Sequence, residues 1–174
     1  GEANGITVAD TASFVAGHSL GEYSALCAAG TFSLSDTARL LQTRGRAMQQ
    51  AVPVGQGAMA AILGLDMDAV REVAASAAEG SVCDVANDNS PGQVVISGDA
   101  SAIERAMELA KARGAKRALS LPVSAPFHCA LMEPAAEAME AALAMVDMKA
   151  PAVPLVANVL ATPITDPAEL FFFF

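Results

Sequence analysis

The sequence predicts an α/β fold in which a smaller unit is inserted into the main one. Two observations carry this prediction. A serine stands between two glycines in Gly17-His18-Ser19-Leu20-Gly21, after an apolar run and before an alanine-rich segment, which is typical of a sharp strand-to-helix turn. Further along, residues 56–123 show the order β-α-β-β-α-β, which is the order of a ferredoxin-like unit.

The first predicted elements surround the serine. Residues 11–17 are short, apolar and β-branched enough for a buried strand. Residues 22–29 are typical of a helix that Gly30 ends. Ser35 is then expected to cap a second helix over residues 36–51, which Pro53 and Gly55 terminate.

The inserted unit begins near Gly57, and its elements follow in a regular order. The predicted strands are 57–65, 83–88, 92–98 and 116–124, the predicted helices are 66–80 and 100–114, and residues 89–92 form a turn. A loop with two prolines follows, then a helix over 134–146 and extended sequence from residue 150. We therefore expect residues 1–55 and 124–174 to share the main α/β core and residues 56–123 to form the subdomain.

Composition excludes several classes of protein. The net charge of −9 argues against nucleic acid as a partner, because phosphate binding needs a basic surface. No apolar stretch approaches the ~20 residues of a membrane helix, and no basic-then-apolar leader opens the chain. The three cysteines are widely spaced and lack a CxxC pair, which favours a reduced setting. We expect a cytoplasmic, monomeric protein with no membrane association.

The Gly-x-Ser-x-Gly pattern makes Ser19 a candidate nucleophile, with the N–H of Leu20 as the first oxyanion donor. The alternative is a structural glycine-rich turn. A serine hydroxyl needs a base, and the chain has only two histidines. His18 adjoins Ser19, and neighbouring side chains on a turn diverge, so His18 either lines the site or packs. His128, in a proline-rigidified loop, is the candidate base; the alternative is an ordinary surface histidine.

Arg44 is the third candidate because of its position on the predicted helix. At about 100° per residue, six small or apolar neighbours lie within about 60° of Arg44: Thr37, Leu40, Leu41, Ala47, Met48 and Ala51. A guanidinium on an apolar face needs an anion, since an unpaired buried charge is costly. That anion is either a protein carboxylate or the carboxylate of a substrate.

Four of the ten basic residues fall within seven positions: Lys111, Arg113, Lys116 and Arg117. A solvated helix end is one interpretation of this cluster. The other is a docking surface for an acidic partner on an otherwise acidic protein.

Five ordered blocks resemble the malonyl-CoA:acyl carrier protein transacylase family of bacterial fatty acid synthesis. They are GHSLGEYSAL, RGRAMQQAVPVGQGAMAAILGL, NDNSPGQVVISG, GAKRAL and PFHCALMEPAA, spread over about residues 15–160. Five blocks in order are far more specific than Gly-x-Ser-x-Gly alone. The resemblance implies an α/β-hydrolase-like core with a parallel sheet and an inserted ferredoxin-like subdomain.

The resemblance also implies roles for individual residues. Ser19 would carry the acyl group, His128 would act as the base, and Arg44 would grip the malonyl carboxylate. Asn87 and Asn89 would lie near the opening through which the acyl group enters. The resemblance further implies that the second oxyanion donor and the residue orienting His128 lie outside these 174 residues.

The implied reaction moves malonyl from malonyl-CoA to the phosphopantetheine thiol of acyl carrier protein through malonyl-Ser19. Malonyl-CoA and acyl carrier protein are then substrates, and no metal or redox cofactor is implied. Two alternatives remain open. A serine hydrolase or thioesterase would share Ser19 and His128 but would have no use for an inward arginine. A non-catalytic carrier-docking module would keep the fold while Ser19 failed to acylate.

Overall fold

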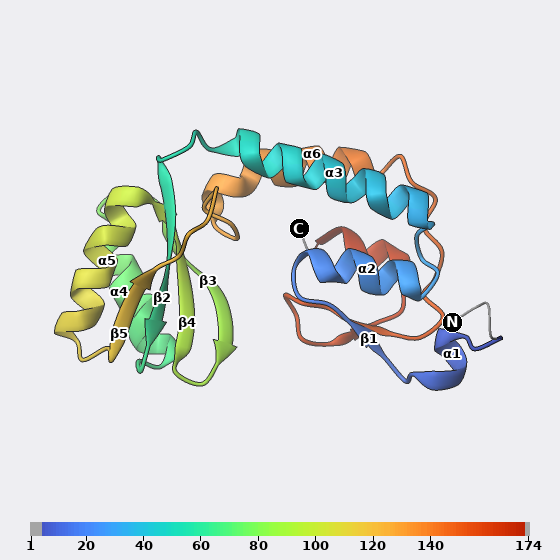
Figure 1. The fold of residues 1–174 in the computed structure, drawn as a ribbon, viewed down its shortest axis with the longest axis horizontal. Helices are drawn as coiled ribbons and strands as arrows, with labels where there is room; N and C mark the ends of the chain where they lie inside the picture. The colour runs from blue at the N-terminus through green and yellow to red at the C-terminus, as the bar shows by residue number, and fades with distance from the viewer. Residues whose placement is uncertain (1–4, 173–174) are drawn as a thin grey trace. The chain divides into compact units, whose positions relative to one another are not determined.

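Two compact units make up the computed structural model, which describes residues 5–172 (Figure 1). One unit joins the residues up to 45 with those from 137 onward, and the other comprises residues 46–136. Both boundaries fall inside helices, namely α3 (Leu34–Ala51) and α6 (Glu133–Leu143). The predicted subdomain limits, 56 and 123, therefore lie inside the second unit.

The second unit is built on a four-stranded antiparallel sheet. Its elements are β2 (Gly57–Leu63), α4 (Met67–Ala78), β3 (Cys83–Ser90), β4 (Gln93–Asp99), α5 (Ala100–Ala112) and β5 (Arg117–Ser120). The strand order is β3-β4-β2-β5, and every neighbouring pair is antiparallel. Helices α4 and α5 lie together against one face of this sheet (Figure 1). The order of elements along the chain is the one predicted from the sequence.

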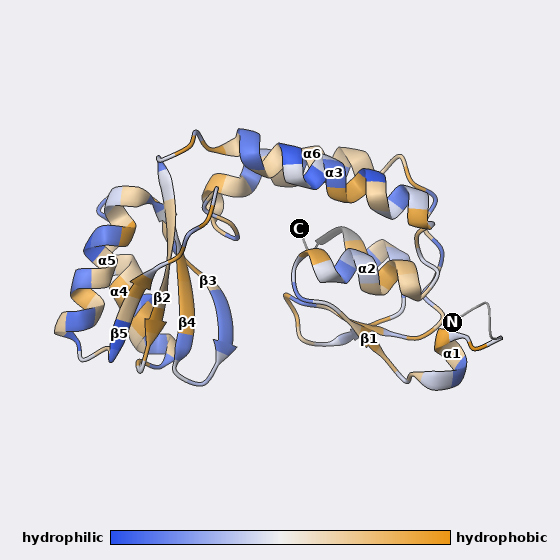
Figure 2. Ribbon diagram, in the orientation of Figure 1, coloured by the Kyte–Doolittle hydropathy of each residue, from blue (hydrophilic) through white to orange (hydrophobic). Residues whose placement is uncertain are grey.

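An apolar core joins these helices to the sheet. Val70 and Val73 of α4 and Ile103 of α5 are fully buried against Ile62 of β2 and Ile96 of β4. The helical residues recur at spacings of three and four, which places them on one face of each helix. Figure 2 shows hydrophobic colour along much of β4, in keeping with a strand whose residues from Val94 to Gly98 are all buried.

Three strand ends in this unit differ from the predicted ones by two residues or more, and one of them is the end of β2, at Leu63 rather than at residue 65. Strand β3 continues to Ser90, so the turn to β4 is the pair Pro91-Gly92, and Gly92 supplies the positive φ of 75° that side chains disfavour. Strand β5 ends at Ser120 rather than at residue 124, shortly before Pro122, which has no N–H for a sheet hydrogen bond.

The first unit contains a small three-stranded sheet. Its elements are α1 (Val8–Thr11), β1 (Val15–Ala16), α2 (Leu20–Ala28), the first part of α3, the last part of α6, β6 (Leu155–Val156), β7 (Pro163–Ile164) and a 3-10 segment, Pro167–Phe172. Strand β1 is parallel to β6, but β7 is antiparallel to β6. The described sheet is thus mixed, which corrects the expectation of a parallel one.

The structure of residues 7–36 also differs from two predictions. Thr7 and Asp10 form a capping box that holds residues 8–11 as a helical turn, so the strand predicted for 11–17 contains only Val15 and Ala16. Helix α3 begins at Leu34, and the N–H of Asp36 donates to Ser33 Oγ at 3.0 Å, so Ser33 rather than Ser35 is the capping serine.

The core of the first unit brings α2, α3, α6 and the small sheet together. Its buried members include Tyr23, Leu26, Leu40, Leu143 and Leu155. Helix α6 starts at Glu133, close to the predicted Pro134, but it ends at Leu143 instead of 146. Among residues 5–172, no helix combines the length and apolar character needed to cross a lipid bilayer.

Candidate active site

Ser19 lies on the turn between β1 and α2, where its backbone has φ 51° and ψ −113°. A positive φ is uncommon for a residue with a side chain and is maintained only where the surroundings hold it. Ser19 is the N-cap of α2, yet its hydroxyl makes no capping hydrogen bond to the helix. The Oγ atom is therefore directed to other groups, as a nucleophile requires.

The two glycines of the motif have different reasons to be glycine. A Cβ atom on Gly17 would overlap the backbone carbonyl of Gly21, because the two segments of the turn pass in direct contact. A Cβ atom on Gly21 would meet nothing within 4 Å. Only the first glycine is thus required by close approach of the backbone.

We expect Gly17→Ala to disrupt the turn and Gly21→Ala to be tolerated. The clash at Gly17 should lower the free energy of unfolding by about 1–3 kcal/mol, as for overpacked sites. The matched Gly21→Ala variant should change it by less than about 1 kcal/mol. Urea unfolding of both variants measures the difference. Equal losses would show that the turn is not limited by the contact between Gly17 and Gly21.

Arg44 contacts the candidate nucleophile. Its Nη2 atom donates a hydrogen bond to Ser19 Oγ at 2.8 Å, across 25 residues of sequence. As the helical periodicity predicted, Arg44 is half-buried on the face of α3 that carries the buried Leu40 and Met48, whereas Arg39 and Arg46 are exposed. The structure therefore brings two of the predicted site residues together.

The charge of Arg44 is only partly compensated within the first unit. None of the ion pairs among residues 5–172 includes Arg44, whose guanidinium lies 6.0 Å from the centre of the Tyr23 ring. Glu22 is the carboxylate that it attracts electrostatically. Burial raises the pKa of Glu22, against the opposing effects of a backbone hydrogen bond and of Arg44. A guanidinium in this state can still bind an incoming carboxylate.

Asn158 is a member of this site that the sequence analysis did not predict. Its Oδ1 atom accepts the backbone N–H of Ser19 at 2.6 Å, and its own backbone N–H donates to Glu22 Oε1 at 2.9 Å. Asn158 lies 139 residues from Ser19 in the sequence, in a short segment without a recognisable motif. Only its position after β6 links it to the turn.

His128 belongs to the second unit, whereas Ser19 belongs to the first. His128 is exposed and has a positive φ of 59°. The loop around it is held on both sides: Pro126 is fully buried, and the N–H of Ala130 donates to Asp84 Oδ2 of β3 at 2.8 Å. Burial raises the pKa of the adjacent Cys129 thiol, which disfavours its thiolate form.

The remaining predicted residues lie on identifiable elements. Leu20 is the first residue of α2, and the exposed His18 precedes the turn, where its carbonyl accepts the N–H of Gly21 at 2.9 Å. Asn87 is half-buried on β3 and pairs with Val95. Asn89, expected in the turn, is an exposed residue of β3 at an irregularity in the strand register.

The basic cluster divides into two pairs. Lys111 and Arg113 are engaged by Glu108 at 2.8 Å and Glu72 at 2.7 Å, respectively. Lys116 and Arg117 are exposed, and neither takes part in an ion pair within the described part of the chain. The second pair is thus the one with charge to offer to a partner.

Comparison with known proteins places these residues in a family. The family model described as acyl transferase domain matches residues 3–170. The chain belongs to this family. Malonyl CoA-acyl carrier protein transacylase of Escherichia coli K12 is 57% identical over 145 residues, which are 83% of this chain and 47% of the relative. The Bacillus subtilis protein of the same name is 51% identical over 92% of this chain and 51% of the relative.

Solved structures show the same relationship for this acyl transferase domain. An acyl-carrier-protein S-malonyltransferase from Bartonella henselae has a TM-score of 0.93 and 60% identity, covering 98% of this chain and 54% of the other. A malonyl-transacylase in complex with its type II PKS acyl-carrier protein has a TM-score of 0.93 and 43% identity, covering 99% and 55%. The chain spans about half the length of the curated relatives that it matches.

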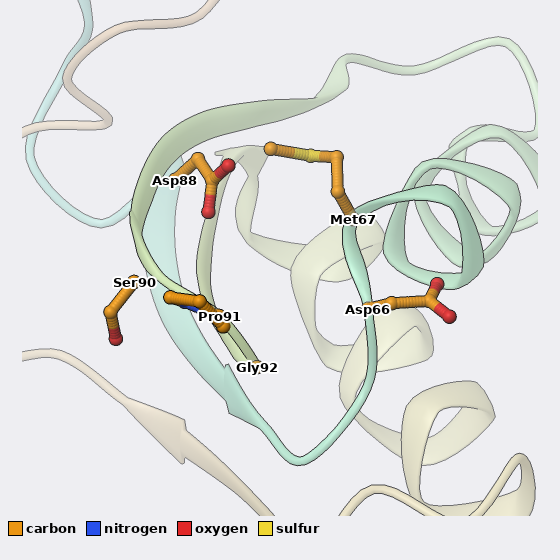
Figure 3. A pocket seen from close by; sticks show the side chains of 6 residues that line it. All are labelled: Asp66, Met67, Asp88, Ser90, Pro91 and Gly92. Atoms are coloured by element: carbon orange, nitrogen blue, oxygen red, sulfur yellow. The ribbon is translucent and has the colours of Figure 1, made fainter.

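A separate pocket of about 410 Å³ lies in the second unit of this acyl transferase domain, beside the β3–β4 turn and the start of α4. Figure 3 shows Met67 extending toward Asp88, while the carboxylate of Asp66 points away. None of the predicted site residues lines this pocket. Within residues 5–172, no three or more His, Cys, Asp and Glu side chains gather in a way that could hold a metal ion.

Proposed function

We propose that this acyl transferase domain moves a malonyl group from malonyl-CoA to the phosphopantetheine thiol of acyl carrier protein, for fatty acid biosynthesis. One observation carries the proposal: a partly compensated guanidinium, Arg44, lies 2.8 Å from the hydroxyl of Ser19. A malonyl thioester has a reactive carbonyl and a free carboxylate separated by one carbon atom. A serine with an adjacent bidentate cation suits both groups. The names of the relatives support the same substrate.

In the proposed first half-reaction, Ser19 Oγ attacks the thioester carbonyl of malonyl-CoA while His128 takes the hydroxyl proton. The carbon–sulfur bond then breaks, and His128 passes the proton to the leaving CoA thiolate, which departs as the thiol. Arg44 exchanges its hydrogen bond to Ser19 for the malonyl carboxylate and so fixes the orientation of the acyl group. The product is malonyl-Ser19.

The second half-reaction reverses these steps with a different thiol. The phosphopantetheine thiol of acyl carrier protein loses its proton to His128 and attacks the malonyl ester carbonyl. The bond to Ser19 Oγ breaks, and His128 returns the proton to the serine. Neither half-reaction as proposed calls on a metal or redox cofactor.

The oxyanion that forms in both steps needs hydrogen-bond donors. The N–H groups of a first helical turn have no partner within their helix, and the helix dipole adds positive potential there. Leu20 is the first residue of α2 and directly follows Ser19. We assign its N–H to the oxyanion.

The relatives establish the α/β class of the fold, and we propose a type for each of its two parts. We infer that residues 56–123 form a ferredoxin-like subdomain, supported by the β-α-β-β-α-β order and the sheet order β3-β4-β2-β5. We infer that residues 1–55 and 124–174 belong to an α/β-hydrolase-like core, supported by strand β1, which precedes the serine turn and pairs in parallel with β6. The three cysteines are free thiols, which supports a cytoplasmic location.

Intact-mass measurement after incubation with malonyl-CoA tests the function. A malonyl adduct that transfers to acyl carrier protein is the expected result. Release of free malonate without transfer would identify a hydrolase or thioesterase instead. The absence of both adduct and malonate would indicate a non-catalytic module.

We also propose that the basic cluster docks the acidic carrier protein, with Lys116 and Arg117 as its main contacts. The support is their exposure and their lack of ion pairs among residues 5–172, in contrast to Lys111 and Arg113. The structure of a malonyl-transacylase relative has been solved in complex with its acyl-carrier protein. Charge complementarity mainly accelerates association, so its contribution falls with salt.

Reversing both Lys116 and Arg117 to Glu should weaken transfer to carrier protein, most strongly at low salt. A loss of about tenfold or more is expected for two reversed charges at a steered interface. Acylation of Ser19 by malonyl-CoA should change much less. The rates of the two half-reactions are measured separately, with Arg71→Glu, an exposed residue of α4, as the control. Equal damage to both half-reactions, or to neither, would contradict the docking proposal.

A further inference from the structure

We propose that Asn158, held in place by Glu22, is a positioning residue that keeps Ser19 in its reactive backbone conformation; the inference rests on the proposed function. Three hydrogen bonds form a closed ring. The N–H of Ser19 donates to Asn158 Oδ1 at 2.6 Å, and the N–H of Asn158 donates to Glu22 Oε1 at 2.9 Å. The N–H of Glu22 donates to the carbonyl of Ser19 at 3.1 Å, which closes the ring.

The ring acts on the part of Ser19 that is strained. A residue with a side chain leaves a positive φ unless neighbouring groups hold it there. Rotation about φ swings the N–H bond of Ser19, and that N–H is the group bound by Asn158. The carbonyl on the other side of Ser19 is bound by Glu22. Both ends of the residue are therefore restrained, while the hydroxyl accepts a hydrogen bond from Arg44.

The position of Asn158 follows from the topology of the small sheet. Val15 pairs with Leu155 and Ala16 with Val156 in parallel register. The carboxyl ends of two parallel strands meet at one edge of a sheet. Ser19 follows β1 and Asn158 follows β6, so residues 139 apart in sequence arrive at the same edge.

Glu22 is suited to anchoring Asn158. Its side chain is 3% exposed and lies in the first turn of α2, where the helix dipole favours a negative charge. Buried carboxylates require hydrogen-bond partners, and the backbone N–H of Asn158 supplies one. The backbone N–H of Asn158 needs only an acceptor oxygen on the side chain of residue 22. The carbonyl oxygen of a glutamine side chain is also an acceptor, so Glu22→Gln can keep this contact.

The test measures the reactivity of Ser19 with a neutral fluorophosphonate probe, which has no carboxylate for Arg44. Asn158→Ala should lower the second-order labelling rate at least about tenfold, because the turn relaxes from the strained conformation. The kcat for malonyl transfer should fall with it, while KM for malonyl-CoA changes less than about threefold, since Arg44 remains. Val159→Ala, at a neighbouring side chain that is 67% exposed, is the control.

The Glu22 variants provide a second, independent comparison. Glu22→Ala should label about as slowly as Asn158→Ala, and Glu22→Gln should stay within about threefold of the unmodified chain because it keeps an acceptor oxygen. If Asn158→Ala does not fold, as judged by circular dichroism, the Glu22 pair decides; if Glu22→Ala does not fold, Asn158→Ala decides.

The outcomes separate the inference from the function on which it rests. If the unmodified full-length protein does not label at Ser19, the proposed function and this inference both fail. If it labels but Asn158→Ala labels equally fast at a lowered Tm, Asn158 is merely structural, the inference fails, and the proposed function stands. Slow labelling with an unchanged KM, together with rescue by Glu22→Gln, supports the positioning role.

Discussion

Ser19→Ala is expected to abolish formation of the malonyl-enzyme, since no other hydroxyl or thiol replaces the nucleophile. His128→Ala should slow acylation by at least ~10², the usual loss when a general base is removed. The physical basis is the half-buried Ser19 hydroxyl on the turn before α2, which makes no capping hydrogen bond, and the small number of histidines in the chain. Rapid-quench measurement of the malonyl adduct by mass spectrometry records both effects.

Ser24→Ala is the matched control for the nucleophile, because Ser24 is an exposed serine of the same helix. It should acylate at the rate of the unmodified chain. Covalent uptake of malonyl by Ser19→Ala would show that the nucleophile has been assigned to the wrong residue. Undiminished acylation in His128→Ala would remove His128 from the mechanism while leaving Ser19 in place.

Arg44→Ala is expected to convert a malonyl-selective site into one that accepts neutral acyl groups. Removing one partner of a desolvated charge pair costs about 2–5 kcal/mol, or roughly 30- to several-thousand-fold in malonyl transfer. Acetyl-CoA lacks the carboxylate, so its transfer should be kept or should increase. Arg44→Lys should restore malonyl transfer only in part, because a point charge does not reproduce the fork of the guanidinium.

The ratio of kcat/KM for malonyl-CoA to that for acetyl-CoA tests this prediction in the unmodified chain and both variants. Arg39→Ala serves as the control, since Arg39 lies on the exposed face of the same helix and pairs with Asp36. If Arg44→Ala lowers kcat/KM equally for malonyl-CoA and acetyl-CoA, Arg44 supports the structure of the turn through its hydrogen bond to Ser19 Oγ. Selectivity for malonyl would then arise from other residues.

Local sequence patterns predicted the turn at Ser19 and the buried face of Arg44 because each depends on the spacing of residues within one or two elements. Two glycines around a serine, after a strand and before a helix, indicated the turn that the structure shows at Ser19. The 3.6-residue period of α3 placed Arg44 on the buried face without knowledge of any neighbour. The order of elements in the second unit also followed from alternating apolar patterns and turns.

Some predicted elements were wrong because a long-range contact or a local side-chain cap outweighed the hydrophobic pattern of the sequence. The strand predicted from residue 11 gave way to a helical turn, because the side chains of Thr7 and Asp10 cap it. Ser33 rather than Ser35 caps α3, a choice between two nearby serines that propensity does not distinguish. The direction of β7, antiparallel to β6, depends on how the chain returns after residue 157.

The sequence by itself determined the nature of the candidate nucleophile, its turn and the inward arginine, because each depends on spacing within one or two elements. Only the tertiary structure decided which groups surround Ser19. Arg44 contacts the Ser19 hydroxyl and Asn158 contacts the Ser19 backbone N–H. These contacts bridge 25 and 139 residues of sequence, respectively. Such contacts depend on how α3 packs and on the parallel register of β1 with β6, and neither arrangement leaves a periodic trace in the sequence.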